Sequence, residues 1–203
     1  MASLGAMSPT STDAIITSRR ADSPAPIGTC PDGLVRAVRA EVRRGLDWQQ
    51  TADRVAHALR VNLPKPAEIL PAPFRRGDPA GYQSHLLYAE PDGTFSISAM
   101  VWLPGQQTMI HDHVAWCVTA VLQGSEHEEI FALADGGRAL RVAARNVNPP
   151  GAVSGFAPPG DIHRVRNTGD GVAISLHVYG ADITRLGSSV RRVYDLPVLA
   201  LST

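Results

Sequence analysis

Three histidines are spaced as the ligands of a metal ion would be. His111 and His113 are separated by one residue, and His163 follows the turn sequence Pro158-Pro159-Gly160. Side chains two apart on a β-strand point to the same face, so a strand through His111 and His113 would direct both imidazoles to one side and Asp112 to the other. The turn before His163 can return the chain across the same space. Three neutral imidazoles leave part of a metal's coordination sphere open, which is typical of catalytic more than of structural sites.

The other histidines and the intervening aspartate receive a plainer interpretation. A single histidine on a strand is more often a hydrogen-bonded core residue than a ligand. We therefore expect His57, His85 and His127, which fit no spacing pattern, to be structural or surface residues. We expect Asp112 to be a turn or surface carboxylate. His111, His113 and His163 differ from these single histidines, because three buried imidazoles without a metal would each need another hydrogen-bond partner.

The residues around the three histidines resemble the two cupin motifs. The first motif is Gly, five residues, His-x-His, three residues, an acidic ligand, six residues and Gly. The chain matches it from Gly105 to Gly124 except at Cys117, where most cupins have Glu. The second motif, Pro-x-Gly-x-x-His-x-x-x-Asn, is matched from Pro158 to Asn167.

The cysteine at the acidic position and a Ser-x-His-x-Tyr segment narrow this resemblance. Ser175, His177 and Tyr179 would share one face of a strand. With them, the chain from Trp48 to Asp195 is similar to the cysteine dioxygenase family of thiol dioxygenases. The resemblance implies a cupin jelly-roll β-barrel with iron(II) on the three histidines. It further implies that Tyr179 steers dioxygen, that His177 and Ser175 fix Tyr179 in place, and that a small thiol becomes its sulfinic acid.

Iron(II) suits this chemistry because ground-state dioxygen is a triplet and reacts slowly with closed-shell thiols. On three neutral histidines the ion keeps enough positive charge to bind and deprotonate a thiol. The sulfinic acid product lies one step below irreversible sulfonate on the oxidation ladder.

Two interpretations of Cys117 are open. In animal members of the family the matching cysteine is covalently joined to the tyrosine that matches Tyr179, whereas many bacterial members have Gly there. We therefore hypothesise a thioether between Cys117 and Tyr179. The alternative is that Cys117 is an inert, small core residue.

The residues that would hold the substrate depart from the family. Members that prefer cysteine place Arg before the first barrel strand, and those that prefer 3-mercaptopropionate place Gln there. The matching position is Ser84, which cannot form a bidentate clamp, and Gln83 beside it would face the other side of the strand. Tyr82 matches a family tyrosine, and a small clamp residue also leaves room for a bulkier thiol such as ergothioneine. The remaining candidates are three arginines, Arg185, Arg191 and Arg192.

Two other classes of function compete with this one. Another cupin oxygenase or isomerase would usually keep the Glu that Cys117 replaces. A non-catalytic metal-binding cupin module would commonly lose ligands, whereas all three histidines are present.

Two helices and a many-stranded domain must position these residues. Residues 1–30, rich in Ser, Thr, Ala, Pro and Gly without an apolar period, predict a flexible leader. From about 32 to 63, apolar residues at three- and four-residue steps predict two short helices, the second capped by Asp47. From about 80 to 203 the period changes to two between Pro/Gly turns, which predicts a single mainly β domain. Strands are expected at about 84–90, 94–103, 115–123, 126–134, 138–144, 152–157, 172–180 and 191–200.

Composition limits the partners and the compartment. The 203 residues carry 19 Lys plus Arg against 19 Asp plus Glu, so the basic surface typical of nucleic-acid binding is missing. No apolar run is long enough for a membrane helix, and the first 30 residues lack a secretory signal. Cys30 and Cys117 are too few for a disulfide framework. We expect a cytoplasmic monomer or small homo-oligomer whose partners are a small thiol and dioxygen.

Overall fold

The computed structural model describes residues 26–199. Most of the leader expected at 1–30 therefore lies outside the described residues. Its last part is packed on the domain, because the Thr29 backbone N–H donates to the Ile69 carbonyl at 3.2 Å and Cys30 is buried. At Gly28 a Cβ atom would lie 1.9 Å from the Ile69 oxygen, so only glycine permits this approach. The folded domain thus begins a few residues earlier than the composition indicates.

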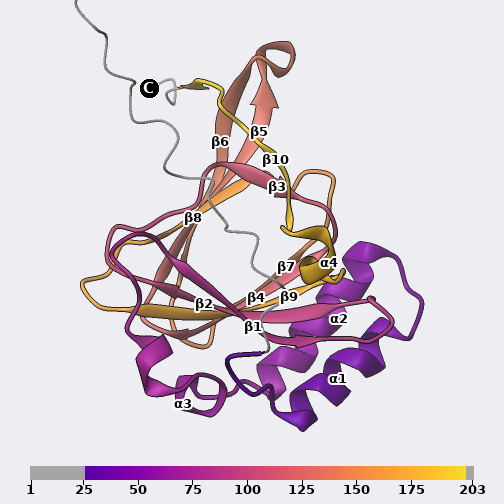
Figure 1. Ribbon diagram of the computed structural model, residues 1–203. Helices are drawn as coiled ribbons and strands as arrows, with labels where there is room; N and C mark the ends of the chain where they lie inside the picture. Colours follow the sequence, from indigo (N-terminus) through magenta and orange to yellow (C-terminus); the bar gives the residue numbers. More distant parts are fainter. Residues whose placement is uncertain (1–25, 200–203) are drawn as a thin grey trace, which may run out of the picture.

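The two expected helices are present and cover one sheet from outside (Figure 1). Helix α1 spans Asp32–Val42 and α2 spans Trp48–Val61. The Asp47 carboxylate accepts the Gln50 backbone N–H at 2.8 Å and so begins α2 as predicted. Two short turns, α3 (Pro66–Ile69) and η2 (Ala72–Arg75), lead from the helices to the strands. No helix among the described residues is long and apolar enough to span a membrane.

The strands form two sheets that face each other, which confirms the mainly β fold class with two helices before it. The five-stranded sheet contains, in spatial order, β1 (Gln83–Ala89), β2 (Ser96–Trp102), β9 (Ala173–Tyr179), β4 (Cys117–Gln123) and β7 (Val153–Phe156). The six-stranded sheet contains β10 (Val190–Val193), β3 (His111–His113), β8 (His163–Asn167), β5 (Glu126–Ala134), β6 (Ala139–Asn148) and β11 (Val198–Leu199). Neighbouring strands are antiparallel except β11 and β6. The remaining elements are η3 (Asp135–Gly137) and α4 (Ile183–Leu186).

Two strands of this fold, β3 and β8, are absent from the strands that apolar alternation predicts, although the spacing of His111 and His113 suggested a strand at β3. They are only three and five residues long and consist mainly of His, Asp, Arg and Asn, so they lack the apolar alternation that indicates a strand. The expected strand at 191–200 is divided into β10 and β11. Pro197 lies just before β11, and a proline cannot donate to a ladder.

The apolar core lies between the helices and the five-stranded sheet. Val38, Val55 and Leu59 are fully buried against the outer face of the sheet. Every residue of β2 and β9 is buried, because the helices cover one face and the other sheet covers the second face. This arrangement allows the space between the sheets to contain polar side chains while the stability comes from the outer layer.

Substitution of Gly155 on β7 tests how closely α2 must approach the sheet. A Cβ atom there would lie 2.9 Å from the Ala52 carbonyl oxygen, and backbone atoms of a helix cannot move aside singly. We expect Gly155→Ala to lower the free energy of unfolding by about 1–3 kcal/mol, measured by urea denaturation. Gly171→Ala is the matched control, since no atom lies within 4 Å of its Cβ position, and should change stability by less than about 0.5 kcal/mol. Equal effects at the two sites would contradict the tight packing of α2.

Candidate metal centre

Three histidines from two neighbouring strands converge between the sheets. His111 and His113 are the ends of β3, and His163 begins β8 directly opposite His111. All three are buried, and one ring nitrogen of each lies within 4.8 Å of the others. The antiparallel pairing therefore places the third imidazole beside the two that strand alternation directs inward.

Hydrogen bonds fix the tautomer of each imidazole. The Nδ1 atom of His111 lies 2.9 Å from the Met109 carbonyl oxygen, and that of His113 lies 3.0 Å from Asp161 Oδ2. The Nδ1 atom of His163 lies 2.8 Å from Glu128 Oε1. Carbonyl and carboxylate oxygens only accept, so each Nδ1 carries the proton and each Nε2 lone pair is left for a ligand.

The surroundings of His111 and His113 favour their neutral forms, as metal ligation requires. Burial, reinforced by His163 and His113, lowers the pKa of His111 to about 3. Burial also lowers the pKa of His113, although Asp161 opposes it. Burial would raise the pKa of Glu128, but His163, Asn146 and His113 together outweigh it and leave the pKa below its ordinary value. Three neutral nitrogen donors backed by two carboxylates fit a divalent transition metal with open coordination positions.

Cys117 lies beside this group without belonging to it. On the paired strands β4 and β9 it is directly opposite Tyr179, and both side chains are buried. Burial raises the pKa of the Cys117 thiol well above its ordinary value, and Glu128 and Asp161 add to the effect. The residue is therefore a neutral thiol, and the metal-binding group consists of three histidines.

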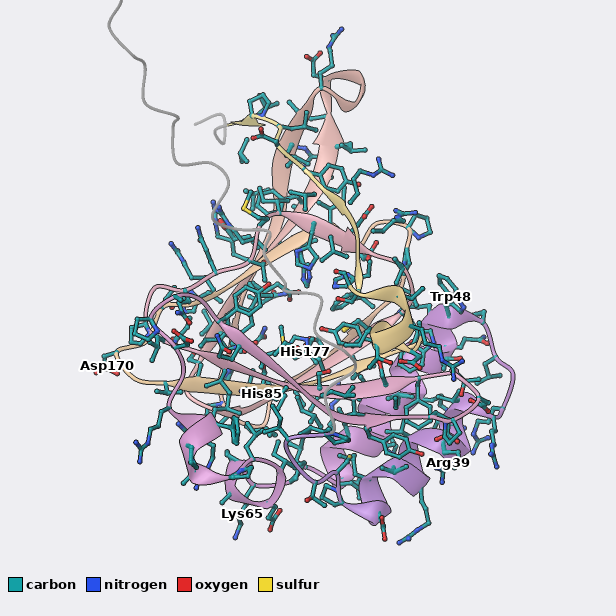
Figure 2. All side chains as sticks on the ribbon, viewed as in Figure 1. Arg39, Trp48, Lys65, His85, Asp170 and His177 are labelled. Carbon is teal, nitrogen blue, oxygen red and sulfur yellow. The ribbon has the colours of Figure 1, made fainter. Side chains whose placement is uncertain are left out.

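A chain of hydrogen bonds runs along β9 next to the histidines. The Tyr179 hydroxyl is 3.3 Å from His177 Nδ1, and His177 Nε2 is 3.0 Å from Ser175 Oγ. The Trp102 indole N–H donates to the same Ser175 oxygen at 3.3 Å. Burial lowers the pKa of His177 to about 3, so this ring is neutral and can donate at one nitrogen while it accepts at the other. Figure 2 shows His177 in the space between the sheets.

A cavity of about 50 Å³ opens between the histidines and this chain. Its wall contains the three metal-binding histidines, His177 and Tyr179. Tyr82 also lines it, stacked on Trp102 with ring centroids 4.4 Å apart. Phe156, Met100, and valine, threonine and serine side chains complete the wall, and no arginine or lysine of the described residues lines it.

Most of the predicted substrate contacts lie elsewhere. Ser84 pairs with Met100, which does line the cavity, but β1 is the edge strand and Ser84 is exposed beyond the wall. Gln83 faces the other side, and its side chain donates to the Gly81 carbonyl. Arg185 binds Asp182 at the surface. Of the predicted contacts, the cavity brings only Tyr82 near the histidines.

Arg191 and Arg192 turn away from the cavity toward Asp112. The expectation that Asp112 is a turn or surface carboxylate is wrong, because the residue is 1 % exposed. It accepts hydrogen bonds from Arg191 and from the Tyr194 hydroxyl, the latter at 2.8 Å. These bonds outweigh the effect of burial and keep the pKa of Asp112 below its ordinary value. The carboxylate thereby attaches β10 to the outer side of β3.

Sequence reasoning missed two residues of the site, Asp161 and Glu128. The sequence contained an indication of each of these two residues. Asp161 stands two residues before His163 in the same turn, and Glu128 is one of three glutamates in a predicted strand. Their pairing with imidazoles depends on which strands become neighbours, which no local pattern indicates. His85 is buried, in agreement with a structural role, although its Nε2 atom has no hydrogen-bond partner.

Comparisons with known proteins identify a family and several similar solved structures. The sequence matches the family described as cysteine dioxygenase type I over residues 53–187. Among solved structures, oxalate oxidase in complex with glycolate is 20 % identical with a TM-score of 0.41, and the match covers 52 % of this chain and 53 % of that chain. The chain thus spans about half the length of that relative.

Two further solved structures have similar scores. A protein with a double-stranded β-helix domain from Klebsiella pneumoniae is 15 % identical with a TM-score of 0.43, and the match covers 54 % of this chain and 85 % of that chain. Oxalate decarboxylase from Bacillus subtilis is 21 % identical with a TM-score of 0.41, over 50 % of this chain and 26 % of that chain.

The carboxylate behind His163 gives a test of the metal centre. Glu128→Gln keeps an acceptor for the Nδ1 proton but removes the charge, so the imidazole becomes a weaker donor. We expect the affinity of the metal-free protein for iron(II), measured by anaerobic calorimetry, to fall about 10- to 100-fold. Glu129→Gln, on the outer face of the same strand and paired with Arg164, is the control and should leave the affinity unchanged. Equal affinities for the two variants would contradict a supporting role for Glu128.

Proposed function

We propose that this chain, which belongs to the cysteine dioxygenase type I family, is an iron(II)-dependent dioxygenase that converts a small thiol to its sulfinic acid. The observation that carries the proposal is the three-histidine group beside the hydrogen-bonded row of Ser175, His177 and Tyr179. The reaction adds both atoms of dioxygen to the sulfur and breaks the S–H bond.

In this proposal His111, His113 and His163 hold the iron. Bound iron(II) would supply the redox activity that lets triplet dioxygen react with a closed-shell thiol. The protein's own part is to exclude water and to position hydrogen bonds. The cavity is small and its histidines are buried, so reactants inside it are shielded from solvent.

Tyr179 is the side chain best placed to contact the reactants. Burial raises the pKa of its phenol well above the ordinary value, so the group keeps its proton throughout the physiological range. Its hydroxyl lies 3.3 Å from His177 Nδ1, and both Tyr179 and Ser189 line the cavity. A neutral phenol in this position can offer a hydrogen bond to oxygen atoms beside the thiol without adding charge.

The cavity wall supports a narrower substrate class. A carboxylate in a small buried space needs a counter-ion or several hydrogen bonds. The described part of the wall has neither arginine nor lysine, and Glu128 and Asp161 behind the histidines add negative charge. We therefore propose a small thiol without a carboxylate, either uncharged or bearing an amine.

A panel of thiols tests both levels of the proposal. We expect dioxygen uptake with stoichiometric sulfinate for cysteamine and 2-mercaptoethanol. For cysteine, 3-mercaptopropionate and ergothioneine we expect kcat/KM at least about tenfold lower, because each loses roughly 1–3 kcal/mol through unpaired charge or poor fit. Oxygen electrode traces and mass spectrometry of the products provide the measurement. Preference for the carboxylate thiols would refute the substrate class alone. Absence of sulfinate from every thiol with the iron-loaded protein would refute the function and favour a non-catalytic metal-binding module.

We further propose that Cys117 and Tyr179 form a thioether during turnover. They are paired across β4 and β9, and both are buried. The bond would replace the thiol hydrogen and one ring hydrogen, with the two electrons passing to dioxygen. We expect the intact mass to fall by two hydrogen atoms and peptide mapping to find the two segments joined. After unfolding, thiol titration should then detect Cys30 alone, which serves as the internal control. Two separate peptides after extensive turnover would rule the cross-link out.

A further inference from the structure

A buried carboxyl group lies near Ser175, the residue at one end of the hydrogen-bonded row on β9. Glu126, the first residue of β5, is 2 % exposed. Its Oε1 atom has no hydrogen-bond partner, and none of the described residues forms an ion pair with it. A carboxyl group in such a position is costly unless it can exist as the neutral acid.

The groups that face Glu126 come from four other positions. Ser175 on β9 and Trp102 on β2 lie near its carboxyl group and, as potential hydrogen-bond donors, oppose the rise of its pKa. Glu128 lies two residues along the same inward face of β5. On β8, Asn167 pairs with Glu126 through the backbone but donates its side-chain amide to the Trp102 and Gly171 carbonyls.

These surroundings leave both forms of the carboxyl group accessible. Burial raises the pKa of Glu126 to about 7, and the Glu128 carboxylate adds to the rise, while Ser175 and Trp102 oppose it. The acid and the carboxylate are then both populated near neutral pH, which is what a group that stores a proton requires.

We propose that Glu126 stores the proton that the thiol loses, and that this proton reaches it from the cavity through Tyr179, His177 and Ser175. The role in turnover rests on the function proposed above. Glu126 acts through other residues and does not touch the reactants, so it is a positioning and proton-storing residue.

With Glu126 ionised, the donors and acceptors of the chain can be assigned uniquely. Ser175 donates its hydroxyl proton to the carboxylate, so His177 must donate from Nε2 to the Ser175 oxygen. His177 Nδ1 then accepts the Tyr179 hydroxyl proton, and an oxygen lone pair of Tyr179 is left toward the cavity. Ser175 uses its one donor and both acceptor positions, the second of which accepts from Trp102.

When one proton is taken up from the cavity, the donor and the acceptor exchange roles in every hydrogen bond between Tyr179 and Glu126. The thiol S–H bond breaks, and its proton joins the Tyr179 oxygen. The former tyrosine proton moves to His177 Nδ1, the Nε2 proton moves to Ser175, and the serine proton moves to Glu126. Each proton moves across one hydrogen bond, no electrons are exchanged, and a thiolate and a neutral Glu126 result. Ser175 again uses one donor and two acceptor positions, and the Tyr179 hydroxyl now points into the cavity as a donor.

The metal-free protein provides the first test, independent of any activity. Infrared difference spectra between solutions well below and well above pH 7 should contain the C=O band of a protonated carboxyl group that disappears with a midpoint near the Glu126 pKa of about 7. The tyrosine C–O stretch should shift with the same midpoint, because Tyr179 changes from donor to acceptor toward His177. Glu126→Gln should abolish both signals, Tyr179→Phe should abolish only the second, and Glu129→Gln should preserve both. A spectrum in which no carboxyl group titrates near neutral pH, or in which the tyrosine signal does not follow it, overturns the proposal.

The pH profile of the iron-loaded enzyme provides the second test. Ionised Glu126 is the active form, so kcat/KM of the wild type should rise as the pH rises through about 7. Glu126→Gln cannot take up the proton, and its kcat/KM should be about 100-fold lower at neutral pH. The deficit should shrink above the thiol's own pKa of roughly 8.5, because a thiolate brings no proton. A constant deficit at all pH values would indicate a structural role and contradict proton storage. Failure of the wild type to oxidise any thiol would instead refute the proposed function, and the infrared titration would still decide whether Glu126 and Tyr179 exchange a proton.

Discussion

The site depends on the position of three protons, those on the Nδ1 atoms of the metal-binding histidines. Each is held by an oxygen that can only accept: the Met109 carbonyl, Asp161 or Glu128. Because the outer nitrogens are committed, the inner lone pairs must converge on one point, and the imidazoles cannot rotate to satisfy themselves elsewhere. Strand β3 supplies two of these rings but is only three residues long, so contacts with a neighbouring strand must hold it in place. Asp112, which lies between the two histidines in the sequence and faces the other side of β3, provides these contacts by binding Arg191 and Tyr194.

The rest of the fold allows these polar groups to be buried. An interior with this many buried imidazoles and carboxylates contributes little hydrophobic stabilisation, and unpaired members would be costly. The apolar contacts are concentrated on the outer face of the five-stranded sheet, where α1 and α2 cover β2, β9 and β4 (Figure 1). Stability and chemistry thus occupy opposite faces of the same strands. On β9 the alternation is explicit, since Leu176 and Val178 belong to the apolar core while His177 and Tyr179 line the cavity.

The sequence predicted those parts of the molecule that depend on short-range patterns. The two helices and the inward alternation of Ser175, His177 and Tyr179 follow from periods of two or of three to four residues, and the family follows from a resemblance between short motifs. Short-range patterns failed where the burial or the partner of a residue depends on which strand lies next to it. Asp112 alternates outward as predicted, but only the presence of β10 makes the outward side a buried one. Ser84 aligns with a substrate-binding position, yet it lies on an edge strand whose end projects beyond the cavity. Glu126 and Glu128 looked like ordinary strand residues because their partners come from β9 and β8.

Cys117 then explains why carboxylates gather behind the metal centre. Where the cupin motif has an acidic ligand, this chain has a thiol that burial keeps neutral, so the three-histidine group carries no negative charge. Asp161 and Glu128 supply negative charge one contact farther out, through hydrogen bonds that leave the ligands neutral. A metal ion held in this way keeps its full charge toward the cavity while the interior as a whole remains compensated. Glu126 is a buried carboxyl group that forms no ion pair with a cation or an imidazole of the described residues. Its electrostatic environment is therefore the one in which taking up a proton costs least.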